Sequence, residues 1–234
     1  MALQILSAGA AKGLVDRLRG EFETLVGSTI DGAFGAVGAI KTRFLSGAPC
    51  DVLILTAAQI AELTALNLLE PKSVAALGAV YTALAVPHGQ PLPAIATEAM
   101  LRNSLLAATA LYAPDMVAST AGKHVSAMLT QLEINADMAP KLRIFADGEA
   151  AMRALAHDAL QGAVGCTQLT EIRNTPGLTA VGKLPPPHQL ATVYTAAVSE
   201  TAADGALARK LVGLLAGPST QHIRDRCGFE KGIR

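Results

Sequence analysis

Two short turns rich in glycine and alanine have the residue types that bind an anion through the backbone. The first turn, Ser7–Gly13, directly follows the apolar run Leu3–Leu6, and the second, Phe34–Ala39, precedes a helical stretch that ends at Gly47–Pro49. Small side chains let a backbone approach a ligand closely, and the start of a helix presents unpaired N–H groups and the positive end of a dipole. Two such helix starts that face each other predict a pocket for a small anion.

Each of these turns is open to a structural and a functional interpretation. Ser7 either caps the first helix or donates its hydroxyl to a carboxylate, because α/β proteins bind ligands at the carboxyl ends of strands. Gly35 and Gly38 either permit a tight strand-to-helix turn or let a ligand come close, and the lack of any bulky polar residue there favours the ligand. The candidate ligand-binding residues of the two turns are Ser7, Gly9, Ala10, Gly35, Ala36, Val37 and Gly38.

Further candidates lie at helix starts and strand ends in the later part of the chain. Ser119 and Thr120 are expected to cap a helix whatever else they do, and Cys166 is expected in the core. Tyr194 either packs in the core or turns its hydroxyl toward the ligand. The complete set is Ser119, Thr120, Ala121, Gly122, Glu149, Ala150, Thr167, Gln168 and Tyr194.

Two titratable residues are candidates for proton transfer. His124 lies near the start of a helix, where a cation opposes the dipole, so it is a candidate acid, base or anion contact. Its neighbour Lys123 is expected to be solvated. Glu171 needs a pKa raised by burial to act as a base. The other histidines show no metal-ligand spacing, so no metal site is expected. No cofactor is expected either, and Arg43, Arg102 and Arg153 are expected on the surface.

The composition limits the kind of protein this is. The 234 residues carry no net formal charge, 51% are hydrophobic and 3% are aromatic, which argues against a nucleic-acid binder with a basic face. No apolar run reaches the roughly 20 residues of a membrane span. Three distant cysteines make no disulfide framework. Without a secretory signal, we expect a cytoplasmic protein if Met1 is native, and a periplasmic one if a signal peptide has been removed.

Strand-like and helix-like segments alternate along the chain, which predicts a mostly parallel sheet. In the first helix an apolar face is expected from Leu14, Val15, Leu18, Phe22 and Leu25. Strands are predicted at 3–6, 29–34, 51–55, 78–86, 110–113, 142–145, 163–167, 178–181 and 190–198, and helices at 10–26, 37–46, 57–66, 94–106, 123–132, 151–160, 170–174 and 203–216. The long strands near 80–86 and 190–198 predict an α/β protein of two Rossmann-like lobes joined by a two-strand hinge, with residues 1–82 plus 196–234 in lobe I and 83–195 in lobe II.

The chain resembles the bacterial molybdate-binding proteins of ABC transporters, which have the type II periplasmic-binding-protein fold. The resemblance spans nearly the whole chain and rests on the opening strand, turn and helix together with Gly47–Val52, Ser119–Gly122, Ala163–Gly165, Leu215–Pro218 and Gly228–Phe229. It implies a small anion bound in a cleft between the lobes, without a cofactor, and an ABC transporter permease as partner if the protein is exported.

The same resemblance implies which groups bind the anion. The family holds its oxyanion with a serine in each of the first two turns, helix-start N–H groups in the second lobe, and a tyrosine after the Val-Gly strand. By position the first serine falls near Ala10, the second among Ala36–Gly38, and the tyrosine close to Gln168. A tetrahedral dianion would lose charge-assisted hydrogen bonds worth roughly 1.5–3 kcal/mol each.

An organic di- or tricarboxylate is therefore expected as the ligand, rather than molybdate. A branch similar to this family includes aconitate isomerase, which moves a double bond in a tricarboxylate. The alternative function is accordingly a cofactor-independent isomerase that acts by proton transfer, with His124 as the candidate catalytic residue.

Overall fold

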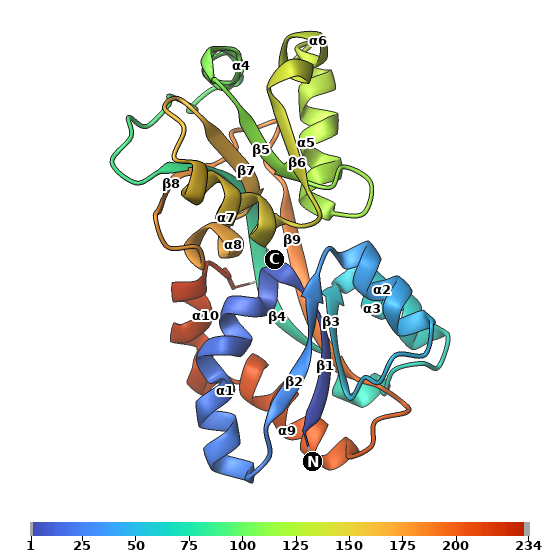
Figure 1. Ribbon diagram of the computed structural model, residues 1–234. Coiled ribbons are helices and arrows are strands. Elements are labelled where there is room, and N and C mark those ends of the chain that lie inside the picture. The colour runs from blue at the N-terminus through green and yellow to red at the C-terminus, as the bar shows by residue number, and fades with distance from the viewer. Residues whose placement is uncertain (1, 232–234) are drawn as a thin grey trace. The chain divides into compact units, whose positions relative to one another are not determined.

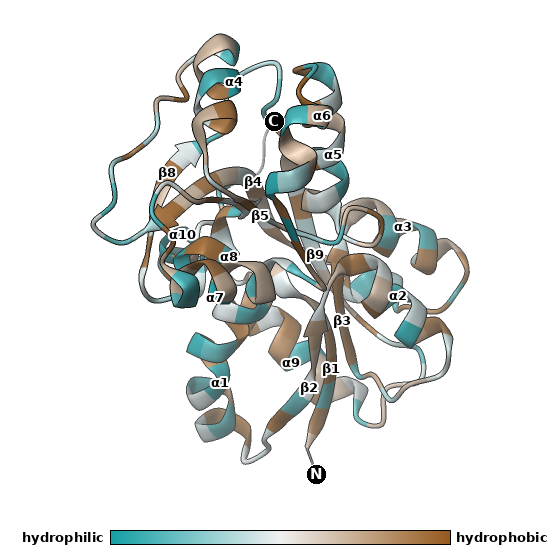
Figure 2. Ribbon diagram, turned by 45° about the horizontal axis from the view of Figure 1, so that its top comes forward, coloured by the Kyte–Doolittle hydropathy of each residue, from teal (hydrophilic) through white to brown (hydrophobic). Residues whose placement is uncertain are grey.

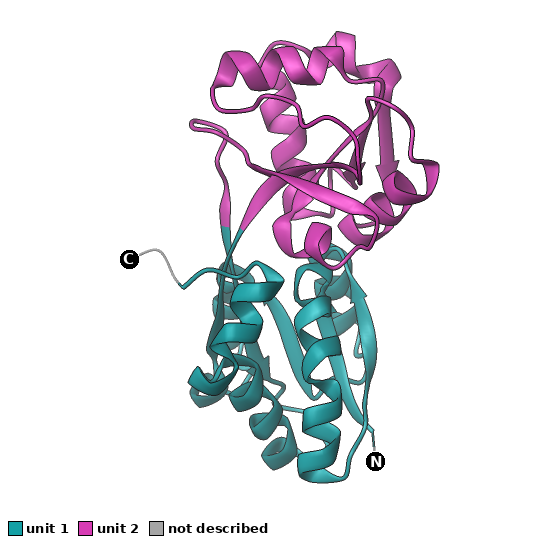
Figure 3. Ribbon diagram, turned by 90° about the vertical axis from the view of Figure 1, so that its left-hand side faces the viewer, with its two compact units in different colours: residues 1–80, 192–234 teal, residues 81–191 magenta. Residues whose placement is uncertain are grey.

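The computed structural model describes residues 2–231 and divides the chain into two compact units (Figure 3). Unit 1 contains the described residues up to Val80 and those from Thr192 onward, and unit 2 is Tyr81–Ala191. The division falls inside strand β4 (Ala75–Pro87) and at the start of strand β9 (Ala191–Val198). Both crossings therefore lie in the long strands predicted from the sequence.

Unit 1 is built on a sheet with the strand order β2-β1-β3-β9 (Figure 1). β1 (Leu3–Ala8) pairs in parallel with both β2 (Ile30–Gly35) and β3 (Val52–Thr56), whereas β9 runs antiparallel to β3. β1 and β3 are coloured mostly as hydrophobic in Figure 2, and Val52–Leu55 are fully buried. A near-continuous apolar run is typical of a strand with both faces covered.

The helices of unit 1 follow its strands. The first one buries Leu14, Val15, Leu18 and Phe22 as predicted, but Leu25 is 69% exposed. Leu25 stands in the last turn, just before Gly27 ends the helix with a left-handed backbone, so the apolar face stops one turn early. The elements are η1 (Gly9–Ala11), α1 (Lys12–Val26), α2 (Val37–Leu45), α3 (Ala57–Ala65), η2 (Pro71–Ser73), α9 (Gly205–Ala216), η4 (Pro218–Thr220) and α10 (Gln221–Cys227).

Unit 2 has its own sheet, in the order β8-β4-β7-β5-β6. β5 (Leu111–Pro114) pairs in parallel with β6 (Leu142–Phe145) and with β7 (Val164–Gln168). β4 runs antiparallel to β7 and to β8 (Leu178–Lys183). The carboxyl ends of β5, β6 and β7 therefore share one edge of this sheet.

Helices cover both faces of the unit 2 sheet. Leu84 and Cys166 on one face pack in a core with Val125 and Met128. On the other face, a Cβ added at Gly165 would lie 2.4 Å from the terminal carbon of Met152. The helices are α4 (Glu98–Ala107), α5 (Thr120–Gln131), α6 (Asn135–Met138), η3 (Ala139–Lys141), α7 (Gly148–Asp158) and α8 (Leu169–Arg173). Glycine at 165 thus brings α7 close to the sheet.

The predicted strands and helices are present in the predicted order, with differences at their ends. The helices α6 and α10 were not predicted, so the helix expected over 203–216 is not the last one. The helix predicted over 94–106 begins only at Glu98, where the Thr97 side chain accepts a hydrogen bond from the Met100 N–H group. The helix predicted from residue 10 begins with the short turn η1. Between residues 2 and 231, no helix is long and apolar enough to cross a membrane.

Candidate functional site

The two small-residue turns of unit 1 lie at the same edge of its sheet. Ala8 at the end of β1 and Gly35 at the end of β2 are partners in the parallel pairing. The chain then passes from Ala8 into η1 and from Gly35 through Ala36 into α2. The candidates Gly9 and Ala10 in the first turn are therefore brought next to Val37 and Gly38 in the second.

Neither helix start at this edge carries a capping side chain within the described part of the chain. Ala8 and Ala36 occupy the N-cap positions of η1 and α2, and no acidic residue stands in either first turn. On the neighbouring strand, by contrast, Thr56 and Gln59 form a reciprocal capping box at the start of α3. The starts of η1 and α2 thus offer N–H groups with neither a side-chain acceptor nor a competing carboxylate.

The side chains near this edge differ from expectation at Ser7. Ser7 is fully buried in β1, and its hydroxyl donates to the Ala8 carbonyl oxygen at 2.9 Å. The N-cap interpretation of Ser7 is wrong, because the strand continues for two residues longer than predicted. Tyr194 is 2% exposed and pairs with Thr56, the last residue of β3, so it too lies at the carboxyl end of the parallel strands.

In unit 2 the segment Ser119–Gly122 forms the start of α5. Ser119 is the N-cap and accepts a hydrogen bond from the Gly122 N–H group at 3.3 Å, while Thr120 is the first helical residue rather than a cap. A Cβ at Gly122 would lie 2.0 Å from the Asp115 carbonyl oxygen. Packing against the end of β5 therefore explains this glycine without a ligand.

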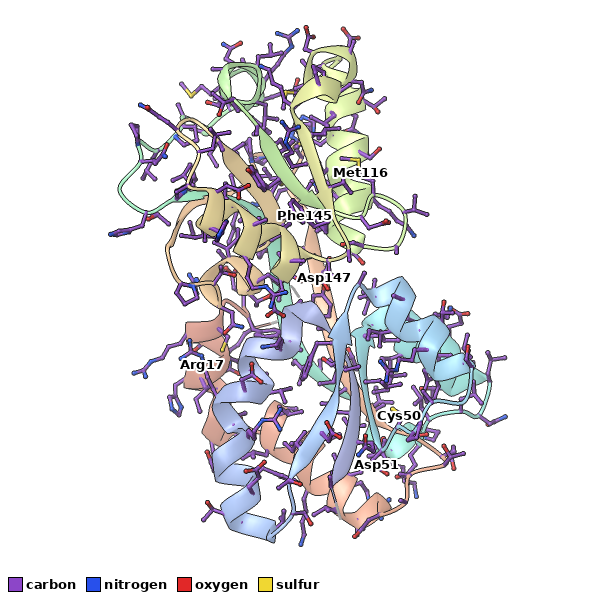
Figure 4. The ribbon with its side chains drawn as sticks, viewed as in Figure 1. Arg17, Cys50, Asp51, Met116, Phe145 and Asp147 are labelled. Atoms are coloured by element: carbon purple, nitrogen blue, oxygen red, sulfur yellow. The ribbon has the colours of Figure 1, made fainter. Side chains whose placement is uncertain are left out.

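Glu149 and Ala150 lie in the first turn of α7, where an acidic cap missed by the sequence analysis precedes them. Asp147, labelled in Figure 4, is the N-cap, and its Oδ1 accepts from the Ala150 N–H group at 2.8 Å. This N–H group, expected to meet the ligand, is engaged. An aspartate immediately before a helix is itself a capping signal, so Asp147 was recognisable in the sequence.

A buried carboxyl group lies against the same helix start. The Thr167 hydroxyl donates to Glu171 Oε2 at 2.5 Å, and a Cβ at Gly148 would lie 1.9 Å from that oxygen. The pKa of Glu171 is raised to about 7, chiefly by burial and also by the nearby charges of Asp147 and Glu149, while hydrogen bonds from Thr167 and the Gln168 backbone partly offset this rise. Glu171 therefore meets the requirement for a group that exchanges a proton near neutral pH.

Gln168 at the end of β7 is 2% exposed. Among the residues that the structure describes, neither its amide oxygen nor its amide nitrogen has a hydrogen-bond partner. Buried amides of this kind are costly unless they are paired. The position predicted as the side-chain contact after the Val-Gly strand thus holds an amide whose hydrogen-bonding capacity is unused.

His124 is half-buried, and burial lowers its pKa. Its Nε2 lies 2.7 Å from the His188 carbonyl oxygen, which fixes Nε2 as a donor. The His188 ring in turn lies 3.1 Å from Glu98 Oε2. The Nε2 atom of His124 is therefore occupied by a hydrogen bond to His188, just before β9. Proton transfer by His124 would have to use Nδ1. Lys123 is exposed as expected.

Other polar candidates are accounted for by surface or structural contacts. Arg43 is exposed, Arg153 pairs with Glu149 at 3.3 Å, and Arg102 donates to the Leu132 carbonyl oxygen. Over residues 2–231, no group of three or more histidine, cysteine, aspartate or glutamate residues could hold a metal ion. Unit 1 has a cavity of about 650 Å³ beside Cys50 and Asp51, and unit 2 has one of about 330 Å³ beside Gln90 and Ser104. None of the predicted site residues lines either cavity.

A family model and a known protein both match almost the whole chain. Residues 3–230 match the family model of the bacterial extracellular solute-binding proteins. An aconitate isomerase from a Pseudomonas species is 26% identical over 234 residues, which cover 97% of this chain and 87% of that protein.

Solved structures share the fold at low sequence identity. The periplasmic molybdate-binding protein of Azotobacter vinelandii has a TM-score of 0.76 and 18% identity over 97% of this chain and 98% of that one. The sulfate-binding protein of Mycobacterium tuberculosis has a TM-score of 0.74 and 14% identity over 99% of this chain and 87% of that one. The type II periplasmic-binding-protein fold is therefore confirmed. Because the family model spans residues 3–230, this chain belongs to the bacterial extracellular solute-binding proteins.

Proposed function

We propose that this protein binds a small organic di- or tricarboxylate as a solute-binding protein. The observation that carries the proposal is the pair of uncapped helix starts, η1 and α2, at the edge where Ala8 pairs with Gly35. Backbone N–H groups at helix starts bind anions, and the helix dipoles favour negative charge there. The lack of acidic residues in both first turns keeps that preference intact.

The side chains at this edge favour a carboxylate over a tetrahedral oxyanion. Ala10 and Ala36–Gly38 supply no hydroxyl group, and the Ser7 hydroxyl already donates to the backbone. Each carboxylate group presents two oxygen atoms rather than the four of a tetrahedral oxyanion, so the backbone donors at this edge can serve one carboxylate group of the ligand. The likeness to an aconitate isomerase supports a polycarboxylate in the same way.

The remaining candidates form a second set of proposed ligand contacts, within unit 2. They stand at the edge of the unit 2 sheet, where β5, β6 and β7 end and α5, α7 and α8 begin. Thr167 and Gln168 are buried there. Asp147 at the α7 start repels an anion, so the α5 start, with Ser119–Gly122, is the more favourable of the two helix starts for a carboxylate. Contact with both lobes stays a prediction.

Delivery to a transporter is the role that follows from the family. The family is described as extracellular, which agrees with a periplasmic location and with a permease of an ABC transporter as the partner. Both the location and the partner are part of the proposal.

One observation favours the alternative of an isomerase. Glu171 is a buried carboxyl group with a pKa raised to about 7 beside Thr167, and such a group can accept and return a proton at neutral pH. In the isomerisation one proton leaves a carbon next to the double bond, the double bond moves by one position, and a proton is returned to the far carbon. His124 through Nδ1 is the other candidate for this transfer.

Thermal unfolding with molybdate, sulfate, citrate, cis-aconitate and trans-aconitate tests the proposal. A carboxylate should raise the melting temperature more than either oxyanion, and stabilisation by molybdate alone would refute the assignment. A proton NMR time course with trans-aconitate separates the two roles, because a binding protein leaves the spectrum unchanged while an isomerase produces a second set of signals.

A pair of variants tests where the anion binds. Ala39→Asp places a carboxylate in the uncapped first turn of α2, on an exposed position, and should weaken carboxylate binding at least tenfold. Thr42→Asp puts the same charge on an exposed position farther along the helix and serves as the control. Equal affinities of the two variants would remove the α2 start from the site.

A further inference from the structure

Two buried polar side chains lie opposite each other on adjacent strands of unit 2. Thr82 on β4 is the register partner of Gln168 at the end of β7. Thr82 is fully buried and Gln168 is 2% exposed. In the part of the chain that the structure describes, Thr82 Oγ1, Gln168 Oε1 and Gln168 Nε2 have no hydrogen-bond partner.

The backbone pairing brings these side chains close together. The Thr82 N–H group donates to the Leu190 carbonyl oxygen, and its carbonyl oxygen accepts from the Leu184 N–H group. Both backbone groups of Thr82 thus point away from β7, which makes Thr82 and Gln168 a non-hydrogen-bonded antiparallel pair. In such a pair the Cα atoms are about 4.5 Å apart and the side chains stand on the same face.

The pair lies at the end of the core where ligands of this fold class are expected. Leu84, two residues after Thr82 on β4, and Cys166, two residues before Gln168 on β7, pack on the same face with Val125 and Met128 of α5. β7 runs parallel to β5, and α5 follows β5, so α5 begins at the edge where Gln168 ends its strand. The carboxyl ends of parallel strands are the usual ligand-binding edge.

The chemistry of the pair selects a particular ligand group. The Gln168 Nε2 and Thr82 Oγ1 atoms offer N–H and O–H donors to a carboxylate oxygen, while Gln168 Oε1 is an acceptor and needs an O–H or N–H donor. A fully ionised tetrahedral oxyanion carries no such hydrogen. A carboxylate with a hydroxyl group or a protonated carboxyl group beside it satisfies all three atoms.

We propose that Thr82 and Gln168 form a subsite for a carboxylate that carries an adjacent O–H group, and that this subsite sets the ligand class. The inference rests on the proposed function and adds Thr82, which no motif in the sequence indicates. Because the three unpaired atoms are buried, they lower the free energy of unfolding of the ligand-free protein. Hydrogen bonds to the ligand remove this penalty.

Isothermal titration calorimetry and urea unfolding of Thr82→Val and Gln168→Met test the subsite together. Both substitutions keep the approximate side-chain volume and remove the unpaired polar atoms. Each variant should bind citrate about tenfold more weakly or worse, yet its free form should unfold at an equal or higher urea concentration than the wild type. The control is Thr179→Val on β8, whose hydroxyl lies 3.3 Å from His88 Nδ1 and whose citrate affinity should not change.

Propane-1,2,3-tricarboxylate, which lacks the hydroxyl group of citrate, identifies the source of the O–H group. At pH 8 the wild type should lose affinity for it relative to citrate if the hydroxyl is used. If a protonated carboxyl group is used instead, citrate and propane-1,2,3-tricarboxylate should bind with equal affinity, and both should bind more tightly at pH 6 than at pH 8. In either case Thr82→Val and Gln168→Met should lose the part of the affinity that the O–H group provides.

Three results separate failure of the subsite from failure of the proposed function. Wild-type protein that binds no carboxylate contradicts the proposed function itself. Wild-type binding with unchanged affinity in Thr82→Val and Gln168→Met overturns the subsite alone. Lower stability of the free variants with unchanged affinity also overturns it, because the two side chains would then hold only an internal water molecule.

Discussion

The raised pKa of Glu171 in unit 2 predicts a measurable pH dependence of the free energy of unfolding. Its pKa is raised from 4.5 to about 7, chiefly by burial, so the folded protein binds one more proton than the unfolded chain between these pH values. The contribution of Glu171 to the free energy of unfolding should therefore be largest below about pH 4.5 and fall as the pH rises toward 7. At about 1.4 kcal/mol for each pH unit, this carboxyl group accounts for a loss of about 3 kcal/mol.

The substitution Glu171→Gln removes the titration while keeping an oxygen that accepts from the Thr167 hydroxyl. Urea unfolding followed by circular dichroism at pH 5, 6, 7 and 8 measures the effect. The variant and the wild type should have similar stability at pH 5, and the variant should be more stable by about 2–3 kcal/mol at pH 8.

The control is Glu21→Gln, which changes an exposed carboxylate on α1 and should follow the wild-type pH dependence. If the stability curves of Glu171→Gln and the wild type run parallel from pH 5 to pH 8, Glu171 is ionised throughout that range. The case for Glu171 as a proton-transfer group would then be lost, whereas the carboxylate-binding proposal, which rests on unit 1, would stand.

Three further outcomes follow from packing and hydrogen bonding. Asp51, labelled in Figure 4, accepts from the Gln4 and Ala203 N–H groups at 2.7 Å each; Asp51→Ala should lower the free energy of unfolding by about 2–5 kcal/mol because both N–H groups lose their acceptor, and an unchanged urea midpoint would contradict this. Gly122→Ala should destabilise the protein by about 1–3 kcal/mol or more, because the new Cβ meets the Asp115 carbonyl oxygen. Gly213→Ala should instead stabilise α9 by up to about 1 kcal/mol, because no described atom beyond its chain neighbours and the nearby backbone of its own helix lies within 4 Å of the new Cβ; calorimetric melting of the two variants checks both. Burial raises the pKa values of the Cys50 and Cys166 thiols to about 12, so neither should react with a thiol reagent at pH 8 until urea is added, and rapid labelling of native protein, located by mass spectrometry, would show that these sites open.

The predictable part of the fold was the part set by local patterns. Period-3.6 apolar spacing identified α1 through Leu14, Leu18 and Phe22, and the apolar run at 52–55 identified a central strand. The ends of helices and strands were harder to predict, because a shift of one residue at an end changes whether a side chain is buried or exposed. Leu25 fits the helical period but lies beyond the layer that the helix covers, and Ser7 lies inside β1 rather than after it.

The site was predictable in outline and not in its pairings. The small-residue turns were recognisable because glycine and alanine leave a backbone accessible, and the structure brings Ala8 and Gly35 together. Strand register, however, is a long-range property, so nothing near Thr82 in the sequence indicates that it faces Gln168. Glu171 is likewise buried because its carboxyl group lies against Gly148 at the start of α7. The sequence of residues 167–171 does not indicate how α7 packs, so this burial could not be predicted.

The division of the chain inside β4 and at the start of β9 has a consequence for biosynthesis. Unit 2 is one continuous stretch, Tyr81–Ala191, whereas unit 1 needs residues from both ends. A nascent chain that has left the ribosome as far as residue 191 holds every residue of unit 2 but lacks the strand that pairs with β3 and the helix that packs on α1. The edge of β3 therefore stays unpaired until β9 has been synthesised and has left the ribosome, and an unpaired strand edge of this kind is prone to aggregate.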